Sequence, residues 1–271
     1  MPPRGRAARA SSSPARTSGC SRKARTLGAD EVVVDLEDAV PEAEKEAARA
    51  LAAEAVRAGL GRTTALRVNA RGTPWWEDDL GAAAAARPDV VVLPKVASPE
   101  DIAAAAELLP AGTGIEAVIE TARGLVEVER IAAAGHGLEA LVFGPADFAA
   151  SVGVPVLTIG AGSFEYARAR IAVAAKANGL QAVDGPHALL DDEAGLVASA
   201  ERALAHGFDG KWAIHPDQIA PVNAVFTPSE EELERARALL ARGGGAGRGG
   251  NEMVDAVSRR LAEALLARAG G

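Results

Sequence analysis

The chain alternates short runs of β-branched and aliphatic residues with longer segments in which apolar residues recur every three or four positions. The short runs are typical of buried strands, and the longer period is typical of amphipathic helices. Because strand and helix follow each other so regularly, the pattern predicts an α/β fold with parallel strands joined by right-handed crossovers. Seven strands are predicted, at residues 31–36, 64–68, 89–93, 115–119, 138–143, 180–183 and 211–214.

Start and stop signals mark the helices between these strands. Ser98 is placed as an N-cap, Pro99 occupies the first helical position, and Asp101 completes a capping box. Gly179 and Gly207 are placed as the stops of two later helices. The predicted helices include residues 42–58, 123–134, 163–178, 192–206 and 229–242, with one more beginning after residue 98.

The first 29 residues differ from the rest because they are rich in arginine and serine and contain no acidic residue. Such a leader is typical of an organellar transit peptide or of a disordered tail. A third interpretation is that residues 1–24 are an altered first βα unit, because a closed barrel needs an eighth strand. Residues 11–23 can be encoded by GC-rich DNA such that a one-base shift reads roughly V-V-V-P-G-E-D-V-G-M-L-A-K. We therefore predict a (β/α)8 TIM barrel over residues 25–242 with an altered first strand.

The last residues have their own pattern. Residues 243–250 are rich in glycine and are predicted to be a flexible linker. Residues 252–269 are predicted to form an amphipathic helix, either an ordinary C-terminal packing helix or one that folds over the mouth of its own or a neighbouring barrel. Its predicted apolar stripe consists of Met253, Val254, Val257, Leu261 and Leu265.

Composition excludes several classes of function. A formal charge of −8 and an aromatic content of 3% disfavour a nucleic-acid partner. A single cysteine, Cys20, excludes an intrachain disulfide and fits a reducing compartment, so a cytoplasmic protein is expected. No apolar run approaches the ~20 residues that span a bilayer, so no membrane partner is expected.

Polar residues gather where the predicted strands end. In a barrel of alternating strands and helices, these ends form the active-site face. Glu120 and Asp147 follow neighbouring strands, and two oxygen ligands with open positions for water and substrate describe a Mg²⁺ site. In isolation, each such residue has a simpler interpretation as a solvated charge, a helix cap or a turn brace. The other polar residues at strand ends are Asp35, Glu37, Asp38, Arg67, Asn69, Lys95, Asp184 and His215.

The motifs DLEDAV, RVN, LPK, IET, FGPADF and GKWAIHPDQI, in this order and spacing, resemble the citrate lyase β-subunit-like CoA-ester lyases of the HpcH/HpaI aldolase superfamily. This group includes malyl-CoA, β-methylmalyl-CoA and citramalyl-CoA lyases, and the resemblance runs from about residue 25 to the C-terminus. It implies a Mg²⁺-dependent TIM barrel, with Mn²⁺ able to substitute. It also implies a homotrimer or hexamer that cleaves or forms a carbon–carbon bond next to a CoA thioester.

The resemblance also implies roles for individual residues. Glu120 and Asp147 match the metal ligands of the family. Arg67 matches the arginine that contacts the substrate and the developing enolate oxygen. Glu37 and Asp38 match acids that hold the waters of the metal and the arginine in place.

Further positions are implied for substrate and for proton transfer. Lys95, Pro145 and Ala146 match substrate-binding positions. Asp255 lies in a segment that looks like the tail motif of the family, whose aspartate enters the site of an adjacent subunit as acid/base. The Gly-rich run before it is looser than the usual connection of the family. The basic residues considered for the CoA phosphates are Lys23, Arg25 and Lys211.

The chemistry of the residues agrees with this resemblance. Cleaving a 3-hydroxyacyl thioester leaves a 2-oxo acid and a thioester enolate; Mg²⁺ can polarise the nascent ketone and Arg67 can stabilise the enolate oxygen. Three alternatives are open: a Schiff-base aldolase with Lys95 as nucleophile, a malyl-CoA-type thioesterase, and an inactive barrel owing to the altered first strand. Several carboxylates near Lys95 would stabilise its ammonium, which disfavours the first.

Overall fold

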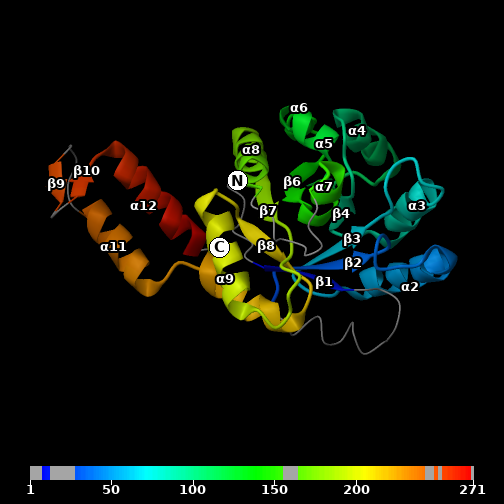
Figure 1. The fold of residues 1–271 in the computed structure, drawn as a ribbon, viewed down its shortest axis with the longest axis horizontal. Coiled ribbons are helices and arrows are strands. Elements are labelled where there is room, and N and C mark those ends of the chain that lie inside the picture. The colour runs from blue at the N-terminus through cyan, green and yellow to red at the C-terminus, as the bar shows by residue number, and fades with distance from the viewer. Residues whose placement is uncertain (1–7, 13–27, 155–163, 242–246, 250–251, 270–271) are drawn as a thin grey trace.

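The computed structural model describes residues 8–12, 28–154, 164–241, 247–249 and 252–269. Its core is a curled sheet of parallel strands covered by helices (Figure 1). The predicted strands are confirmed to within one residue at each end. They are β2 (Glu31–Asp35), β3 (Thr63–Arg67), β4 (Val90–Leu93), β5 (Gly114–Ile119), β6 (Leu138–Phe143), β7 (Gln181–Asp184) and β8 (Gly210–Ala213).

A further strand, β1 (Ala8–Ser12), lies inside the arginine-rich leader. It pairs in parallel with β2 through Arg9 and Glu31 and with β8 through Ala8 and Lys211, so the strand order runs as a closed ring from β1 to β8. β1 lies within residues 1–24, where an eighth strand is expected, but it ends at Ser12, whereas the shifted reading frame covers residues 11–23. The predicted helix start that would follow it lies outside the described residues.

Helices cover the outside of the sheet. Ser98 and Asp101 form the predicted capping box at the start of α4. The single helix predicted at residues 123–134 is wrong: it is two short helices, because the backbone at Glu127 leaves helical dihedrals at φ −94° and ψ 4°. The helices are α2 (Lys45–Ala58), α3 (Trp76–Ala86), α4 (Pro99–Leu108), α5 (Ala122–Val126), α6 (Val128–Ala132), α7 (Pro145–Ser151), α8 (Glu165–Ala177), α9 (Glu193–Ala205), α10 (Ile219–Phe226), α11 (Glu230–Ala241) and α12 (Ala256–Ala269), with short 3-10 turns η1 (Glu42–Glu44) and η2 (Pro216–Gln218). Within the described ranges, none of them has both the length and the apolar character that crossing a bilayer requires.

The strands present alternate residues to two separate apolar layers. The larger layer lies between sheet and helices, and the smaller one fills the inside of the curled sheet. Asp35, Arg67 and Glu120 each lie two residues after a member of the inner layer. The pleat therefore directs these three side chains to the inner side of the sheet, above the apolar filling. The inner layer consists of Val33, Ala65, Val90, Val92, Val118, Ala140, Val142, Val183 and Trp212.

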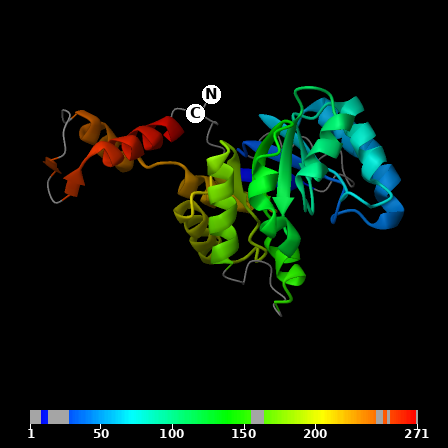
Figure 2. The same cartoon turned by 90° about the horizontal axis from the view of Figure 1, so that it is seen from above.

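The C-terminal residues form an arm that extends away from the sheet in both views (Figures 1 and 2). It consists of α11, the antiparallel strands β9 (Gly247–Gly249) and β10 (Glu252–Val254), and α12, which packs on α11. The predicted helix over residues 252–269 is wrong at its start, because Met253 and Val254 belong to β10 and pair with β9. Of the predicted stripe, Val257 and Leu261 are 51% and 67% exposed, since α12 buries Ala262 instead.

Candidate active site

A bidentate ion pair joins the ends of β2 and β3. Nε and Nη2 of Arg67 donate to the two carboxylate oxygens of Asp35 at 2.7 and 2.6 Å. The ring centroid of Trp212, on β8, lies 5.7 Å from the guanidinium carbon of Arg67. Burial alone would lower the pKa of Arg67, but the hydrogen bonds to Asp35 raise it above its usual range. Arg67 is therefore a fixed, permanently charged group whose plane is set by two contacts.

Glu37 lies two residues after Asp35, between two cations. Its Oε2 is 3.0 Å from Nη1 of Arg67, and its Oε1 accepts a hydrogen bond from Nζ of Lys95. Burial raises the pKa of Glu37 despite these two positive charges. Asp38 is 61% exposed and lies 3.9 Å from both cations. Glu37 is thus the buried acid that connects Arg67 to Lys95, and Asp38 is a peripheral one.

Lys95 connects this group to the next strand end. Its backbone is left-handed, with φ 53°, and its N–H donates to Oε1 of Glu120 at 2.8 Å while its side chain reaches Glu37. Partial burial would lower the pKa of Lys95, but the hydrogen bond to Glu37 and the charges of Glu37, Asp38 and Asp147 raise it. A Schiff-base nucleophile needs the opposite shift, so this alternative is not supported.

Glu120 is a buried carboxyl at the end of β5, only 3% exposed. Burial, followed by the charges of Glu37 and Asp147, raises the pKa of Glu120 to about 8. Gly144 makes room for this side chain, because a Cβ at that position would lie 2.4 Å from Oε2 of Glu120. Gly144 directly precedes α7, whose first turn carries Asp147. The two acids predicted to converge therefore lie close enough that the charge of one disfavours ionisation of the other.

This arrangement fits a hard divalent cation. Between Glu120 and Asp147 there is like-charge repulsion that a cation would reverse, and both groups supply oxygen donors. The buried Oε2 of Glu37 is 3.0 Å from Nη1 of Arg67, so the Glu37 carboxylate is held by one cation on each oxygen. Within the described residues, no cluster of three or more acidic, histidine or cysteine side chains forms a complete cage. Two carboxylates with remaining positions for water and substrate are the usual protein contribution to a Mg²⁺ site.

Asp184 and Lys211 do not face the site. Asp184 comes one residue after the inward-facing Val183, so its side chain lies on the outer face of β7, toward the helices. Its carboxylate accepts hydrogen bonds from Nζ of Lys211 at 2.5 Å and from Nε of Arg168 at 3.2 Å. Lys211 is 1% exposed and also donates to the carbonyl of Gly185 at 2.7 Å. The prediction that Lys211 contacts a CoA phosphate is therefore wrong, because its ammonium is sealed between the sheet and the helices.

Asp255 starts α12 in the arm. Its Oδ1 accepts hydrogen bonds from the backbone N–H groups of Val257 and Ser258, both at 2.9 Å, and the backbone bond from Ser258 lowers the pKa of Asp255. The structure thus shows it as the helix cap, joined to β10 at the end of the arm remote from the sheet (Figure 1). Pro145 and Ala146 open α7 beside Gly144. Lys23 and Arg25 lie outside the described residues.

Sequence reasoning missed Lys45, Asp79 and the role of Asn69. Lys45 and Asp79 are buried, and both are in phase with the apolar stripes of their helices. A charged residue inside an apolar stripe is a signal that a buried partner exists. Asn69, predicted to end its strand at the site, instead binds both groups from behind the site.

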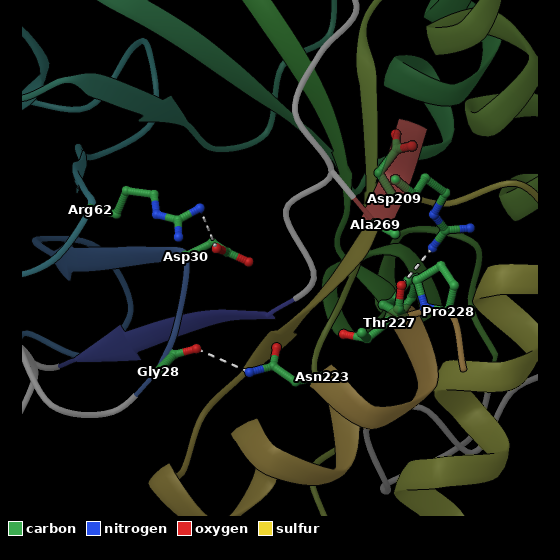
Figure 3. A pocket seen from close by; sticks show the side chains of 10 residues that line it. Gly28, Asp30, Arg62, Asp209, Asn223, Thr227, Pro228 and Ala269 are labelled. Carbon is green, nitrogen blue, oxygen red and sulfur yellow. Dashed lines mark hydrogen bonds and ion pairs between the residues drawn. The ribbon is translucent and has the colours of Figure 1, made fainter. Parts of the chain in front are cut away.

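A cavity of about 280 Å³ lies elsewhere (Figure 3). Its lining includes Asp30, Arg62 and Asp209, which directly precede strands, so it lies at the opposite ends of the strands from Glu120. The side chain of Asn223 donates to the carbonyl of Gly28 at 3.0 Å on one wall, and Arg62 lies 3.4 Å from Asp30. The cavity is therefore separate from the acidic group described above.

Comparison with known proteins gives one consistent family. Residues 13–216 match the HpcH/HpaI aldolase/citrate lyase family. An L-malyl-CoA/beta-methylmalyl-CoA lyase of Cereibacter sphaeroides is 36% identical over 285 residues, covering 91% of this chain and 89% of the relative. A (3S)-malyl-CoA thioesterase of the same species is 39% identical over 231 residues, covering 81% and 76%.

A solved structure agrees with the sequence matches. Protein CitE from Mycobacterium tuberculosis, in complex with magnesium, acetoacetate and coenzyme A, is 34% identical, has a TM-score of 0.84, and covers 100% of both chains. The family match covers most of this chain, and both curated relatives exceed a third identity. The chain therefore belongs to the HpcH/HpaI aldolase/citrate lyase family.

Proposed function

We propose that this protein is a Mg²⁺-dependent carbon–carbon lyase that cleaves, or in reverse forms, a 3-hydroxyacyl-CoA thioester, giving an acyl-CoA and a 2-oxo acid. Malyl-CoA, methylmalyl-CoA, citramalyl-CoA and citryl-CoA are the candidate substrates. The observation that carries the proposal is the acid pair Glu120 and Asp147, connected through Lys95 and Glu37 to the fixed guanidinium of Arg67. A chelating 2-oxo acid and an enolate need these two kinds of group side by side.

Glu120 and Asp147 would hold the Mg²⁺. The metal supplies a Lewis acid that lowers the pKa of the substrate hydroxyl and polarises the nascent ketone. The Glu37 carboxylate, held by Arg67 and Lys95, lies near enough to Glu120 for its charge to raise the pKa of Glu120, so it is placed to orient a water of the metal. Lys95, through its backbone N–H, fixes one oxygen of Glu120 and so sets the direction of the other.

Arg67 is placed to stabilise the oxygen of the thioester enolate. Both oxygens of Asp35 bind Nε and Nη2, which leaves Nη1, 3.0 Å from Oε2 of Glu37, as the nitrogen proposed to meet the enolate oxygen. A guanidinium already held in place pays little reorganisation when negative charge develops on the substrate. Lys95, Pro145 and Ala146 border the same space and are proposed as substrate contacts, and Lys23 and Arg25 as CoA contacts.

Proton transfer is assigned to Asp255 of a neighbouring copy of the chain. Within one chain this residue lies at the remote end of the arm, so it reaches a metal site only if the arm extends to another subunit (Figures 1 and 2). A homotrimer or hexamer would satisfy this geometry.

We also propose that the chain is a complete (β/α)8 barrel whose first βα unit has an altered sequence. Resequencing the gene tests this, and an intact upstream reading with no frame encoding another strand would refute it.

The activity is tested with purified protein, Mg²⁺ and the four candidate CoA esters. The expected result is release of glyoxylate, pyruvate or oxaloacetate together with an acyl-CoA, and loss of that release with EDTA. No 2-oxo acid from any ester, with or without Mg²⁺, would refute the lyase.

A thioesterase is the second candidate, because a (3S)-malyl-CoA thioesterase is among the relatives. Hydrolysis of malyl-CoA gives malate and free CoA, whereas the lyase gives glyoxylate and acetyl-CoA. Measuring free thiol and 2-oxo acid in the same reaction separates the two. Free thiol without 2-oxo acid would assign the chain to hydrolysis.

A further inference from the structure

Lys45, the first residue of α2, is a buried lysine that pairs with no carboxylate among the residues that the structure describes. It is 6% exposed, and its three donors all go to neutral acceptors. Nζ donates to the backbone carbonyls of Leu36 and Glu37, both at 2.7 Å, and to Oδ1 of Asn69 at 2.6 Å. Its ammonium lies 5.3 Å from the ring centre of Trp75. Burying a charge costs free energy, and these three hydrogen bonds offset that cost. They also hold the carbonyls of Leu36 and Glu37 in fixed positions.

Asn69 extends this contact into a network. Its Nδ2 donates to the carbonyl of Leu36 at 3.0 Å and to Oδ2 of Asp79 at 2.6 Å, and its backbone N–H donates to the same Asp79 oxygen at 3.0 Å. The other oxygen of Asp79 accepts from Nε of Arg49 at 2.7 Å. The network therefore ties α2, α3 and the end of β3 to the two peptide units that follow β2.

The same two peptide units carry Glu37 into the site. On their buried side they are held by Lys45 and Asn69; on their other side the Glu37 carboxylate meets Arg67 and Lys95. The contact of Lys95 with Glu120 is separate, because the backbone N–H makes it and not the ammonium. A change in the carbonyl positions of Leu36 and Glu37 would thus move the acid that aligns both cations, with no direct effect on Asp147.

We propose that Lys45, supported by Asn69 and Asp79, is a positioning residue for catalysis: it fixes the backbone of Leu36 and Glu37 so that the Glu37 carboxylate aligns Arg67 and Lys95 for the transition state. This inference rests on the proposed lyase function. A misplacement of about 1 Å in such a group can cost ~10²-fold in rate. The expected loss falls on kcat, because Glu37 holds the side chain of Lys95 whereas Glu120 is held by the backbone N–H of Lys95, so the metal ligands keep their contacts.

The test uses Lys45→Met, which keeps the length and the apolar stem of the side chain and removes all three donors. Lys176→Met is the matched control, because Lys176 lies on the surface of α8 and its ammonium pairs with Asp209 outside the proposed site. The protein is assayed with the CoA ester that the wild type cleaves, and Mg²⁺ affinity is measured separately by calorimetry. We expect kcat to fall ~10²-fold in Lys45→Met with KM and Mg²⁺ affinity within about threefold of wild type, and no change in the control.

Asp79→Asn is the second variant in case Lys45→Met does not fold. It weakens the network three contacts away from Glu37, through Asn69 and Lys45, and is expected to lower kcat by ~10-fold in the same pattern. A kcat within threefold of wild type in a folded variant with a lowered melting temperature would make Lys45 merely structural and overturn the proposal. A parallel loss of Mg²⁺ affinity would also overturn it. Absence of wild-type turnover would instead refute the lyase function on which the inference depends.

Discussion

Gly144 and Glu120 are in direct contact across neighbouring strands: a Cβ on Gly144 would lie 2.4 Å from Oε2 of Glu120 and 2.5 Å from its Cβ. Real side chains do not approach so closely, so the absence of a side chain at residue 144 sets the position of the carboxylate. Since Gly144 also precedes α7, this contact brings the first turn that carries Asp147 against Glu120. The acid pair therefore depends on a glycine as much as on the acids.

Gly144→Ala is predicted to displace the Glu120 carboxylate and to lower lyase kcat/KM by ~10²-fold or more, because a group positioned for the transition state is moved. The measurement is steady-state release of 2-oxo acid. The control is Gly81→Ala, whose new Cβ meets nothing within 4 Å on α3. Wild-type activity in Gly144→Ala would show that Glu120 need not occupy this position.

Arg67→Lys is predicted to lower kcat by ~10²- to 10³-fold. A lysine keeps the charge but cannot make the two parallel hydrogen bonds to Asp35, so its ammonium is no longer held above Trp212. Single-turnover cleavage of the CoA ester measures the effect. Arg170→Lys, in an exposed pair with Glu129, serves as the control and should keep full activity.

The metal-free protein is predicted to lose stability as the pH rises from about 5 to about 8. The pKa of Glu120 is raised to about 8 in the folded state, whereas an unfolded Glu titrates near ~4.3, so the folded state binds more protons in this window. The free energy of unfolding then falls with increasing pH, by a few kcal/mol at most, since one pKa unit is worth ~1.4 kcal/mol. Urea unfolding in EDTA at several pH values measures the slope.

Glu120→Gln is the control for this pH dependence, because it removes the titrating carboxyl with little change in volume. It should flatten the profile between the two pH values and leave the protein at least as stable as wild type near pH 8. An equally steep fall in Glu120→Gln would assign the pH dependence to other groups.

Lys211→Met is predicted to destabilise the fold by about 3 kcal/mol, because it leaves the buried Asp184 with Arg168 alone. The exposed pair of Lys176 with Asp209 gives the comparison, and Lys176→Met should cost less than ~1 kcal/mol. Urea unfolding at pH 7 measures both. An unchanged KM for the CoA ester in the folded Lys211→Met protein would agree with its position away from CoA.

The alternation along the strands explains which site residues could be predicted from the sequence. Glu120 and Arg67 stand in phase with the apolar residues that face the inside of the sheet, and both reach the site. Asp184 comes one residue after the inward-facing Val183 and so points to the helices. Counting by two from Val183 would have separated Asp184 from the others; a polar residue at a strand end was not a sufficient criterion.

The parts that the sequence did not predict depend on contacts between distant segments. The prediction that the last helix starts at residue 252 was wrong, because Glu252–Val254 form β10 and pair with β9. Strand pairing outweighs the helical apolar pattern at these residues. The contacts of Lys45 could not be predicted, because its acceptors are two backbone carbonyls and Asn69, which lies 24 residues further along the chain. Asp255 matched a motif, but its position in the arm is set by the packing of α12 on α11.

The most direct test of the account is calorimetric titration of Mg²⁺ into the wild type, Glu120→Gln and Asp147→Asn at pH 8. The account predicts one Mg²⁺ per chain in the wild type and an affinity at least ~10-fold lower in each variant, because two carboxylates supply the protein ligands. Mg²⁺ binding of wild-type strength in both variants would contradict it, and so would a wild type that binds no Mg²⁺ at all.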